Sequence, residues 1–300
     1  FLSFRTARLA ACFARGGVME SFVPFFLNMM TLISILLIVS LGLAVIFGLM
    51  NVINLAHGEF ITIGAFSLVA VQALGGSFWL ALIVAPMVGY LIGLALEKIL
   101  ISRVYHSPLQ AILVTWGLSL IIQQVLVLTF GAMPQRVFGP FEGSIEIAGA
   151  TYPTYRLFLI GFSLAVFAVT ITLFRVTRFG LDLRACIQST EIAAVLGVNG
   201  ARINAHAFAL GAALAALAGV LLAPMAAVTA YMGINYLARS FFVVLVGGAG
   251  SVSGVAAGSA LIGGLETFLT YQIPATVAQA LVLALAVVIL RFRPNGILPA

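Results

Sequence analysis

The sequence predicts an all-α fold: a polytopic membrane helical bundle of about eight transmembrane helices, within a range of about seven to ten. Three observations support it: a near absence of charge, a series of long apolar windows, and arginines gathered in a few loops. Only 7% of the 300 residues are charged and 63% are hydrophobic. So few charges cannot cover a soluble globule, and disorder requires the opposite composition.

Long windows without Asp, Glu, Lys or Arg define the candidate spans. Each is long enough for at least one crossing of roughly 17–25 residues. The windows are 21–58, 60–96, 104–135, 157–174, 203–238, 240–265 and 267–290. Gly75 and Gly76 near the middle of the second window predict two shorter helices there. Between the third and fourth windows, the alternation from Ser144 to Ile147 predicts a small external hairpin within 131–156.

The arginines predict which loops face the cytoplasm. Loop 97–108, loop 175–204 and the C-terminal Arg291 and Arg293 are the basic segments, so the positive-inside rule places them in the cytoplasm. Three unbroken spans after residue 204 (205–228, 240–268 and 275–290) would instead put Arg291 outside. A break at 247–251, with a half-helix entering and leaving the membrane, returns Arg291 to the cytoplasmic side. At least one broken helix is therefore expected.

The chain reads as one membrane domain over 19–300, preceded by an N-terminal extension or cytoplasmic segment over 1–18. Cys12 and Cys186 lie far apart and predict neither a metal site nor a disulfide framework. The net charge of +6 is explained by cytoplasmic arginines, so no nucleic-acid partner is expected. There is one Lys and no phosphate-binding loop, so an ATP-hydrolysing activity would have to lie on another chain.

The first candidate site lies between the first two windows, in the stretch from Gly48 to Phe60. It contains Asn51, Asn54, His57 and Glu59. At membrane depth each of these polar groups needs a partner or a water-filled cavity, which favours a substrate pathway or gate. The alternative is an ordinary interfacial loop with a helix cap. A zinc deaminase is excluded, because the Pro-Cys-x-x-Cys element is missing.

The second candidate is the stretch 115–124. On a helix, Trp116, Ser119 and Gln123 share one stripe, with Gln124 beside it. Such a stripe can face a substrate path, and its alternative is polar contact between helices.

The third candidate is the cytoplasmic segment 179–199, which predicts a short exposed helix. Ser189 or Thr190 can cap its start, Glu191 suits its first turn, and Gly197 can end it in the left-handed conformation. Ile192, Val195 and Leu196 then share an apolar face, which indicates a partner protein. The alternative is a helix lying on the membrane or on its own bundle.

Glycines and one carboxylate complete the candidates. Gly250, Gly254 and Gly258 follow a four-residue spacing that permits close helix packing. Glu266, near a span end, reads either as part of a membrane-edge cluster or as a proton or substrate site.

The stretch from Gly48 to Gly64, with its run Asn-Leu-Ala-His-Gly-Glu, resembles the signature of the inner-membrane permeases of branched-chain amino acid ABC transporters. Segments 179–199, 242–258 and 292–297 resemble the same family in order and spacing. The resemblance covers about Met19 to the end of the chain. It implies a multi-pass permease of the bacterial inner membrane without catalytic activity or cofactor.

The resemblance also implies an importer of several subunits. Two permeases, cytoplasmic ATPases and an external solute-binding protein would act together in the lipid bilayer. The loop around 175–204 would be the coupling loop, with its candidate residues Arg184, Thr190, Glu191, Ala193, Ala194 and Gly197. The stretch 115–124 is closer to the urea and amide permeases, so a urea or short-chain amide importer is an alternative.

Two other classes remain as alternatives. An ion-coupled secondary transporter needs ionisable groups inside the spans, for which Glu59 and Glu266 are the candidates. An intramembrane enzyme needs a nucleophile and base or a metal cluster, and three scattered histidines give it little support.

Overall fold

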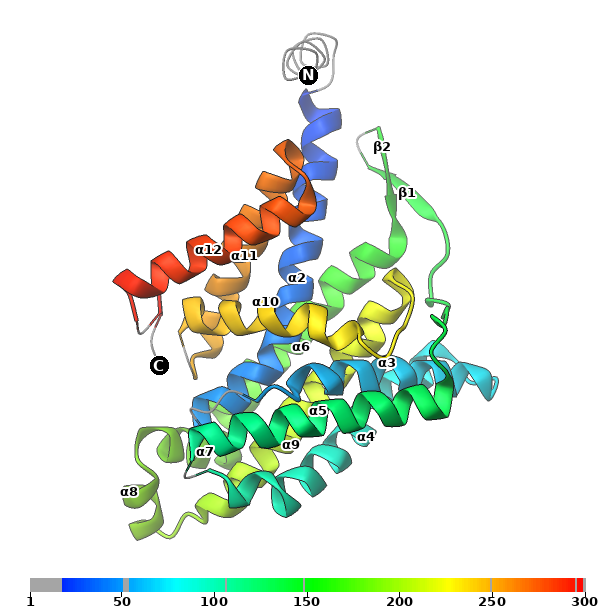
Figure 1. The fold of residues 1–300 in the computed structure, drawn as a ribbon. Helices are drawn as coiled ribbons and strands as arrows, with labels where there is room; N and C mark the ends of the chain where they lie inside the picture. Colours follow the sequence, from blue (N-terminus) through cyan, green and yellow to red (C-terminus); the bar gives the residue numbers. More distant parts are fainter. Residues whose placement is uncertain are drawn as a thin grey trace.

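The computed structural model describes residues 18–50, 54–105, 107–147, 149–248, 250–294 and 296–298. Most of the predicted segment 1–18, together with Asn51, lies outside them. The described residues form a bundle of α-helices with one small hairpin, which confirms the predicted all-α architecture (Figure 1). The helices are α2 (Val18–Met50), α3 (His57–Ala73), α4 (Phe78–Ile99), α5 (Pro108–Phe130), α6 (Thr154–Val176), α7 (Arg178–Gln188), α8 (Thr190–Val195), α9 (Gly200–Leu222), α10 (Met232–Gly247), α11 (Val252–Gln272) and α12 (Ala275–Phe292).

Seven of the described helices are long and apolar enough to cross a membrane, namely α2, α4, α5, α6, α9, α11 and α12. The shorter α3 and α10 have 17 and 16 residues. The predicted division of the second window is confirmed, because α3 ends before Gly75 and α4 begins after it. Gly75 has a φ of +78°, and Ser77 then caps α4 by accepting a hydrogen bond from Leu80 N at 3.4 Å.

The predicted hairpin is also confirmed. Strands β1 (Ser144–Ile147) and β2 (Ala150–Pro153) pair antiparallel, with Ser144 opposite Pro153. The hydroxyl of Tyr152 donates to Leu27 O at 2.9 Å and so ties the hairpin to the first half of α2.

Helix α9 lies at the centre of the bundle and is buried along most of its length. Its neighbours approach through small residues: Gly89 and Gly93 of α4 lie against Ala212, and Gly42 of α2 lies against Gly211. Small side chains allow helix backbones to come close where apolar burial does not drive association. The core that positions the site is therefore this close-packed group of α2, α3, α4 and α9.

The predicted break at 247–251 is confirmed, and both helices that flank it are longer than the half-helix expected there. Helices α10 and α11 run antiparallel, because Gly247 meets Gly254 while Val243 meets Gly258. A methyl group on Gly254 would lie 2.5 Å from the carbonyl oxygen of Gly247. Gly250 lies in the turn before α11, with a φ of +76°.

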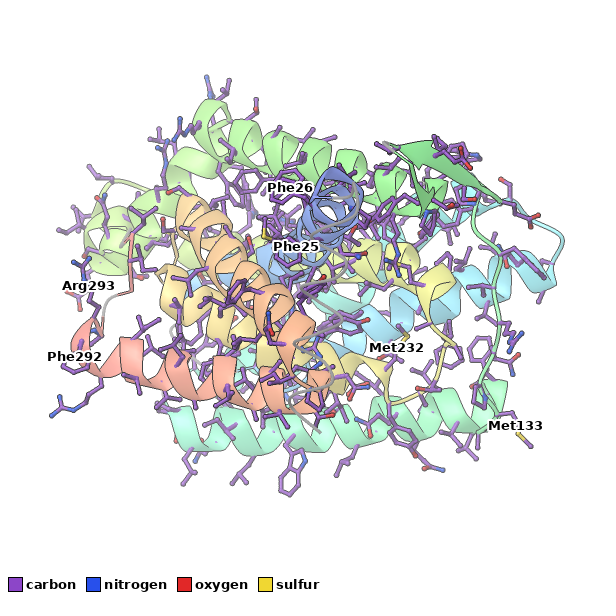
Figure 2. The ribbon with its side chains drawn as sticks, turned by 90° about the horizontal axis from the view of Figure 1, so that it is seen from above. Phe25, Phe26, Met133, Met232, Phe292 and Arg293 are labelled. Carbon is purple, nitrogen blue, oxygen red and sulfur yellow. The ribbon has the colours of Figure 1, made fainter. Side chains whose placement is uncertain are left out.

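The segments predicted to be cytoplasmic gather at one end of the bundle. Arg175 and Arg184 share the wall of one cavity with residues of the α10–α11 turn. After α12 the chain returns to that turn, where Ile297 N and Leu298 N donate to Val246 O and Gly247 O at 2.8 and 2.9 Å. Figure 2 shows Arg293 and Met133 at opposite ends of the molecule.

Candidate functional site

Helix α3 begins inside the bundle rather than at its surface. Leu55 N donates to the Thr115 hydroxyl at 3.2 Å. Thr115 is seven residues beyond the start of α5 at Pro108, or about 10 Å along that helix at about 1.5 Å per residue. The Asn54 side chain accepts from Ala56 N at 3.0 Å and shapes the turn that starts α3. The stretch is therefore buried within the bundle, away from the start of α5.

A buried carboxyl group joins the first two candidate segments. Glu59 is 1% exposed, and its Oε1 accepts hydrogen bonds from Ser119 Oγ at 2.8 Å and from Gln123 Nε2 at 2.7 Å. Gln123 Nε2 also donates to Ser119 Oγ at 3.0 Å. Trp116, which shares their predicted stripe, is 56% exposed, and Gln124 is exposed too. Neither joins this network.

The turn at 54–59 concentrates polar atoms without partners. Among the described residues, six buried side-chain nitrogen or oxygen atoms have no hydrogen-bond partner, and four of the six lie here. These four are Asn54 Nδ2, His57 Nδ1, His57 Nε2 and Glu59 Oε2. Burying such a group unpaired is costly, so native proteins rarely leave several together without a reason. The Val39 carbonyl faces the His57 ring and the Thr62 hydroxyl faces Glu59, but neither contact has the geometry of a hydrogen bond, so the cluster suits a further polar partner.

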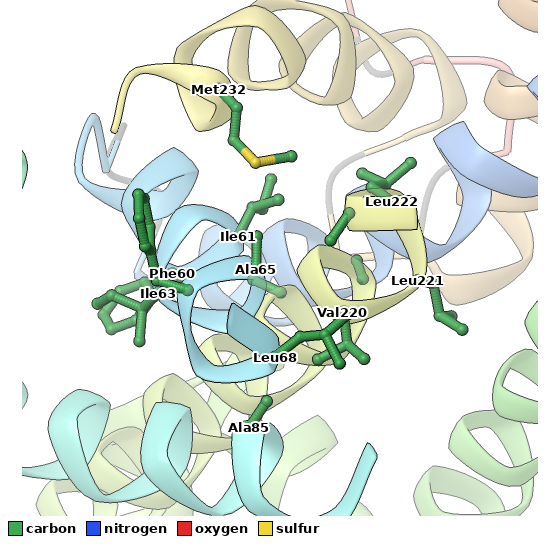
Figure 3. Packing of buried hydrophobic residues seen from close by; sticks show 14 of the residues in the cluster. Phe60, Ile61, Ile63, Ala65, Leu68, Ala85, Val220, Leu221, Leu222 and Met232 are labelled. Atoms are coloured by element: carbon green, nitrogen blue, oxygen red, sulfur yellow. The ribbon is translucent and has the colours of Figure 1, made fainter. Parts of the chain in front are cut away.

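The start of α10 closes over the start of α3. The backbones of Gly58 and Gly233 touch, and no side-chain carbon fits between them. Gly233 N donates to Thr62 Oγ1 at 3.1 Å. Figure 3 shows the Met232 side chain pointing from α10 toward Ile61 and Ala65 of α3.

An apolar cavity of about 350 Å³ lies beside this contact, between α2, the 54–55 turn and α10. Its wall includes Leu43, Asn54, Leu55, Ile234, Leu237 and Phe241. Phe241 is held from behind by an edge-to-face contact with Phe47, with ring centroids 6.0 Å apart. The polar turn thus faces an apolar space.

Arg239 is a residue that the sequence reasoning missed. Its guanidinium lies 3.4 Å from Glu266 Oε1, the one ion pair found among the described residues. Glu266 is 5% exposed, and the pair links α10 to α11. A lone Arg between two long uncharged windows was the available signal, because an intramembrane charge usually has a partner.

The segment predicted to be cytoplasmic forms two short helices, α7 and α8, and α8 has an exposed apolar face. Ser189 caps α8 by accepting a hydrogen bond from Ile192 N at 3.3 Å, and Gly197 follows with a φ of +86°. Ile192, Val195 and Leu196 are 64%, 88% and 75% exposed. Of the candidate coupling residues, Ala193 is buried, whereas Arg184, Thr190, Glu191, Ala194 and Gly197 are exposed.

Cys186 is buried behind that face in α7. Burial, together with the nearby Asp182 carboxylate, raises the pKa of its thiol. The thiol therefore stays protonated and unreactive at neutral pH.

The chain matches one family model over most of its length. The family model described as "Branched-chain amino acid transport system / permease component" matches residues 25–291. The high-affinity branched-chain amino acid transport system permease protein LivH of Salmonella typhimurium is 31% identical, over 92% of this chain and 95% of its own. BraD of Pseudomonas aeruginosa, described in the same words, is 29% identical over 90% and 94%.

One solved structure, PsaBC from Streptococcus pneumoniae in complex with Fab, resembles the chain more distantly. The match covers 95% of this chain and 95% of that chain, with 15% identity and a TM-score of 0.49.

Proposed function

Because the chain belongs to the family of branched-chain amino acid transport system permease components, we propose that its α3, α5 and α10 form the translocation path for branched-chain amino acids in an ABC importer. The chain is a multi-pass membrane permease of the inner membrane. The observation that supports the path is the group of four buried polar atoms at 54–59 that lack a hydrogen-bond partner among the described residues. In this proposal Asn54, His57, Glu59, Ser119 and Gln123 line or gate the path, and Asn51 and Gln124 remain predicted members.

The alternatives are not favoured. Both relatives named above are described as branched-chain amino acid permeases, so a urea or amide importer gains no support. Membership of this family likewise speaks against an ion-coupled secondary transporter and an intramembrane enzyme.

The proposed importer takes its energy from separate subunits. We infer that residues 19–300 act as one permease domain, paired with a second permease, two cytoplasmic ATPases and an external solute-binding protein. The exposed apolar face of α8 supports the loop 175–204 as the site where an ATPase docks. An exposed cluster of this kind commonly marks a protein interface. ATP binding would then shift the equilibrium between inward- and outward-facing states through this contact.

The coupling loop can be tested with Arg184→Glu and Gly197→Ala in the complete transporter reconstituted in proteoliposomes. Gly197 has a φ of +86°, a backbone conformation in which a β-carbon costs roughly 1–2 kcal/mol. The Arg184→Glu substitution reverses the charge at its position. Both variants should insert normally and lose ATP-driven leucine uptake. Arg136→Glu, an exposed arginine at the opposite end, is the matched control and should retain uptake. Normal uptake by both loop variants would contradict the coupling assignment.

A further inference from the structure

A basic cavity lies at the end of the bundle that is predicted to face the cytoplasm. It measures about 390 Å³ and lies between α2, α6, α7 and the turn before α11. Two arginines belong to its wall, Arg175 from the last turn of α6 and Arg184 from α7. No carboxylate belongs to the wall as described, and the one ion pair among the described residues joins Arg239 to Glu266. The two guanidinium groups in the wall are therefore not paired with an acid, and the cavity favours an anion.

Most of the remaining wall is apolar. It is formed by Ala44, Val45, Ile171, Phe174, Leu183, Ile187 and Val252. Four of these side chains are buried, which gives the cavity a closed apolar floor. Ile171 precedes Arg175 by four residues, or about 6 Å along α6 at about 1.5 Å per residue. The apolar part of the wall therefore begins about one helical turn closer to the middle of the bundle than the charge does.

The start of α11 adds a polar rim to the cavity. Ser253 belongs to the wall and is exposed, and its Oγ lies 3.1 Å from the Ser251 hydroxyl. Because a hydroxyl hydrogen rotates to suit its surroundings, Ser253 can exchange this bond for one to a phosphate oxygen. The first turn of α11 carries no acidic residue, so nothing in that turn offsets the partial positive charge of the helix N-terminus.

We propose that this cavity binds an anionic membrane lipid, with its phosphate at Arg175 and Arg184 and the start of an acyl chain against Val45, Ile171 and Phe174. Guanidinium groups match the geometry of phosphate oxygens, and basic pockets between membrane helices on the cytoplasmic side bind lipid head groups. A soluble phosphate could use the arginines but would leave the apolar floor unfilled, so a lipid fits the whole cavity better. The inference needs only that the chain is a membrane permease, and it holds whatever the permease transports.

Photoreactive phosphatidylglycerol, with a diazirine near the start of one acyl chain, tests the site directly. The complete transporter is reconstituted in phosphatidylcholine vesicles that contain this probe and is irradiated, and the labelled peptides are mapped by mass spectrometry. We expect label on peptides containing Val45, Ile171 and residues 250–253. Phosphatidylcholine with the same diazirine is the control probe, and it should label these peptides weakly because its head group has no net charge. Equal labelling by the two probes, or no label on these peptides, would overturn the proposal. Loss of the label on addition of inorganic phosphate would show a site for soluble phosphate and would overturn the lipid as its ligand.

A negative charge placed in the rim gives an independent test. Ser253→Glu should reduce labelling by the phosphatidylglycerol probe at least about tenfold, because the added carboxylate repels the phosphate. The variant should still fold, since Ser253 is exposed and an acidic residue suits the first turn of a helix. Ser253→Gln has nearly the same size without the charge and is the matched control, which should keep most of the labelling. Wild-type labelling of Ser253→Glu would overturn the proposal.

Arg175→Gln separates the site from a general attraction of the basic loops to an anionic membrane. Arg178→Gln removes one charge from the same end of the bundle, at an exposed position that does not line the cavity, and is the matched control. A hydrogen bond between charged groups is worth about tenfold or more in affinity, so labelling should fall at least about tenfold in Arg175→Gln alone. Arg184 is left unchanged, because it is also a candidate coupling residue. Equal labelling of the two variants would show that surface charge alone attracts the lipid and would overturn the site.

Discussion

The bundle is interrupted at two turns, one before α3 and one between α10 and α11. They differ in whether their polar groups are hydrogen-bonded. At the second, Ser251 Oγ accepts from Gly254 N at 3.1 Å, and the returning C-terminal segment satisfies Val246 O and Gly247 O. At the first, four buried polar atoms have no partner among the described residues. A helix break by itself does not mark a site, because all its polar groups can be hydrogen-bonded within the chain. The turn before α3 is a candidate site because some of its polar groups are not.

The largest expected effect is at Glu59. Glu59→Leu removes the acceptor of the Ser119 hydroxyl and of one Gln123 Nε2 N–H group, while the other bond of Gln123 Nε2, to Ser119 Oγ, remains. Each buried donor left without an acceptor costs about 1–3 kcal/mol. Thermal unfolding in detergent should shift downward, and uptake should fall with it. Glu59→Gln keeps an acceptor oxygen at the same place and is the control. An unchanged unfolding temperature for Glu59→Leu would contradict a stabilising role for the hydrogen bonds of Glu59.

An intermediate effect is expected where the second interruption packs. Gly254→Ala places a methyl group 2.5 Å from Gly247 O, so α10 and α11 must move apart at a cost of about 1–3 kcal/mol. The matched control is Gly161→Ala on α6, where an added methyl group meets nothing within 4 Å. The control should be neutral or slightly stabilising, because alanine favours helix. Equal unfolding temperatures for the two variants would refute the packing role of Gly254.

The smallest effect is expected at the cap of α11. Ser251→Ala removes the acceptor for Gly254 N and should lower the free energy of unfolding by about 1 kcal/mol. Uptake per folded transporter should stay at the wild-type value. A loss of uptake in well-folded Ser251→Ala protein would contradict a purely structural role for Ser251.

Local signals in the sequence predicted the local features. Paired glycines marked the end of α3, alternation marked the hairpin, and the glycine cluster marked the turn before α11. Pairings distant in sequence were out of reach: Gln123 meets Glu59 only because α5 and α3 lie side by side in one register. Arg239 was missed as a partner of Glu266 for the same reason. The start of α10 was placed too late, because the window 203–238 reads as one apolar run although the chain leaves α9 after Leu222.

The hydrogen bonds of Glu59 have a mechanical consequence. Besides the ring contact of Phe130 with Phe66, α5 is attached to α3 and its preceding turn through Thr115, Ser119 and Gln123. In a bilayer, apolar contact with a neighbouring helix gains little over contact with lipid, so such polar bonds set where a peripheral helix sits. Glu59 Oε1 is thus the shared acceptor through which two residues of α5 fix the position of that helix against α3. Without these two bonds, α5 would keep the Leu55–Thr115 hydrogen bond and its ring contact with α3, but its position would be less strongly determined.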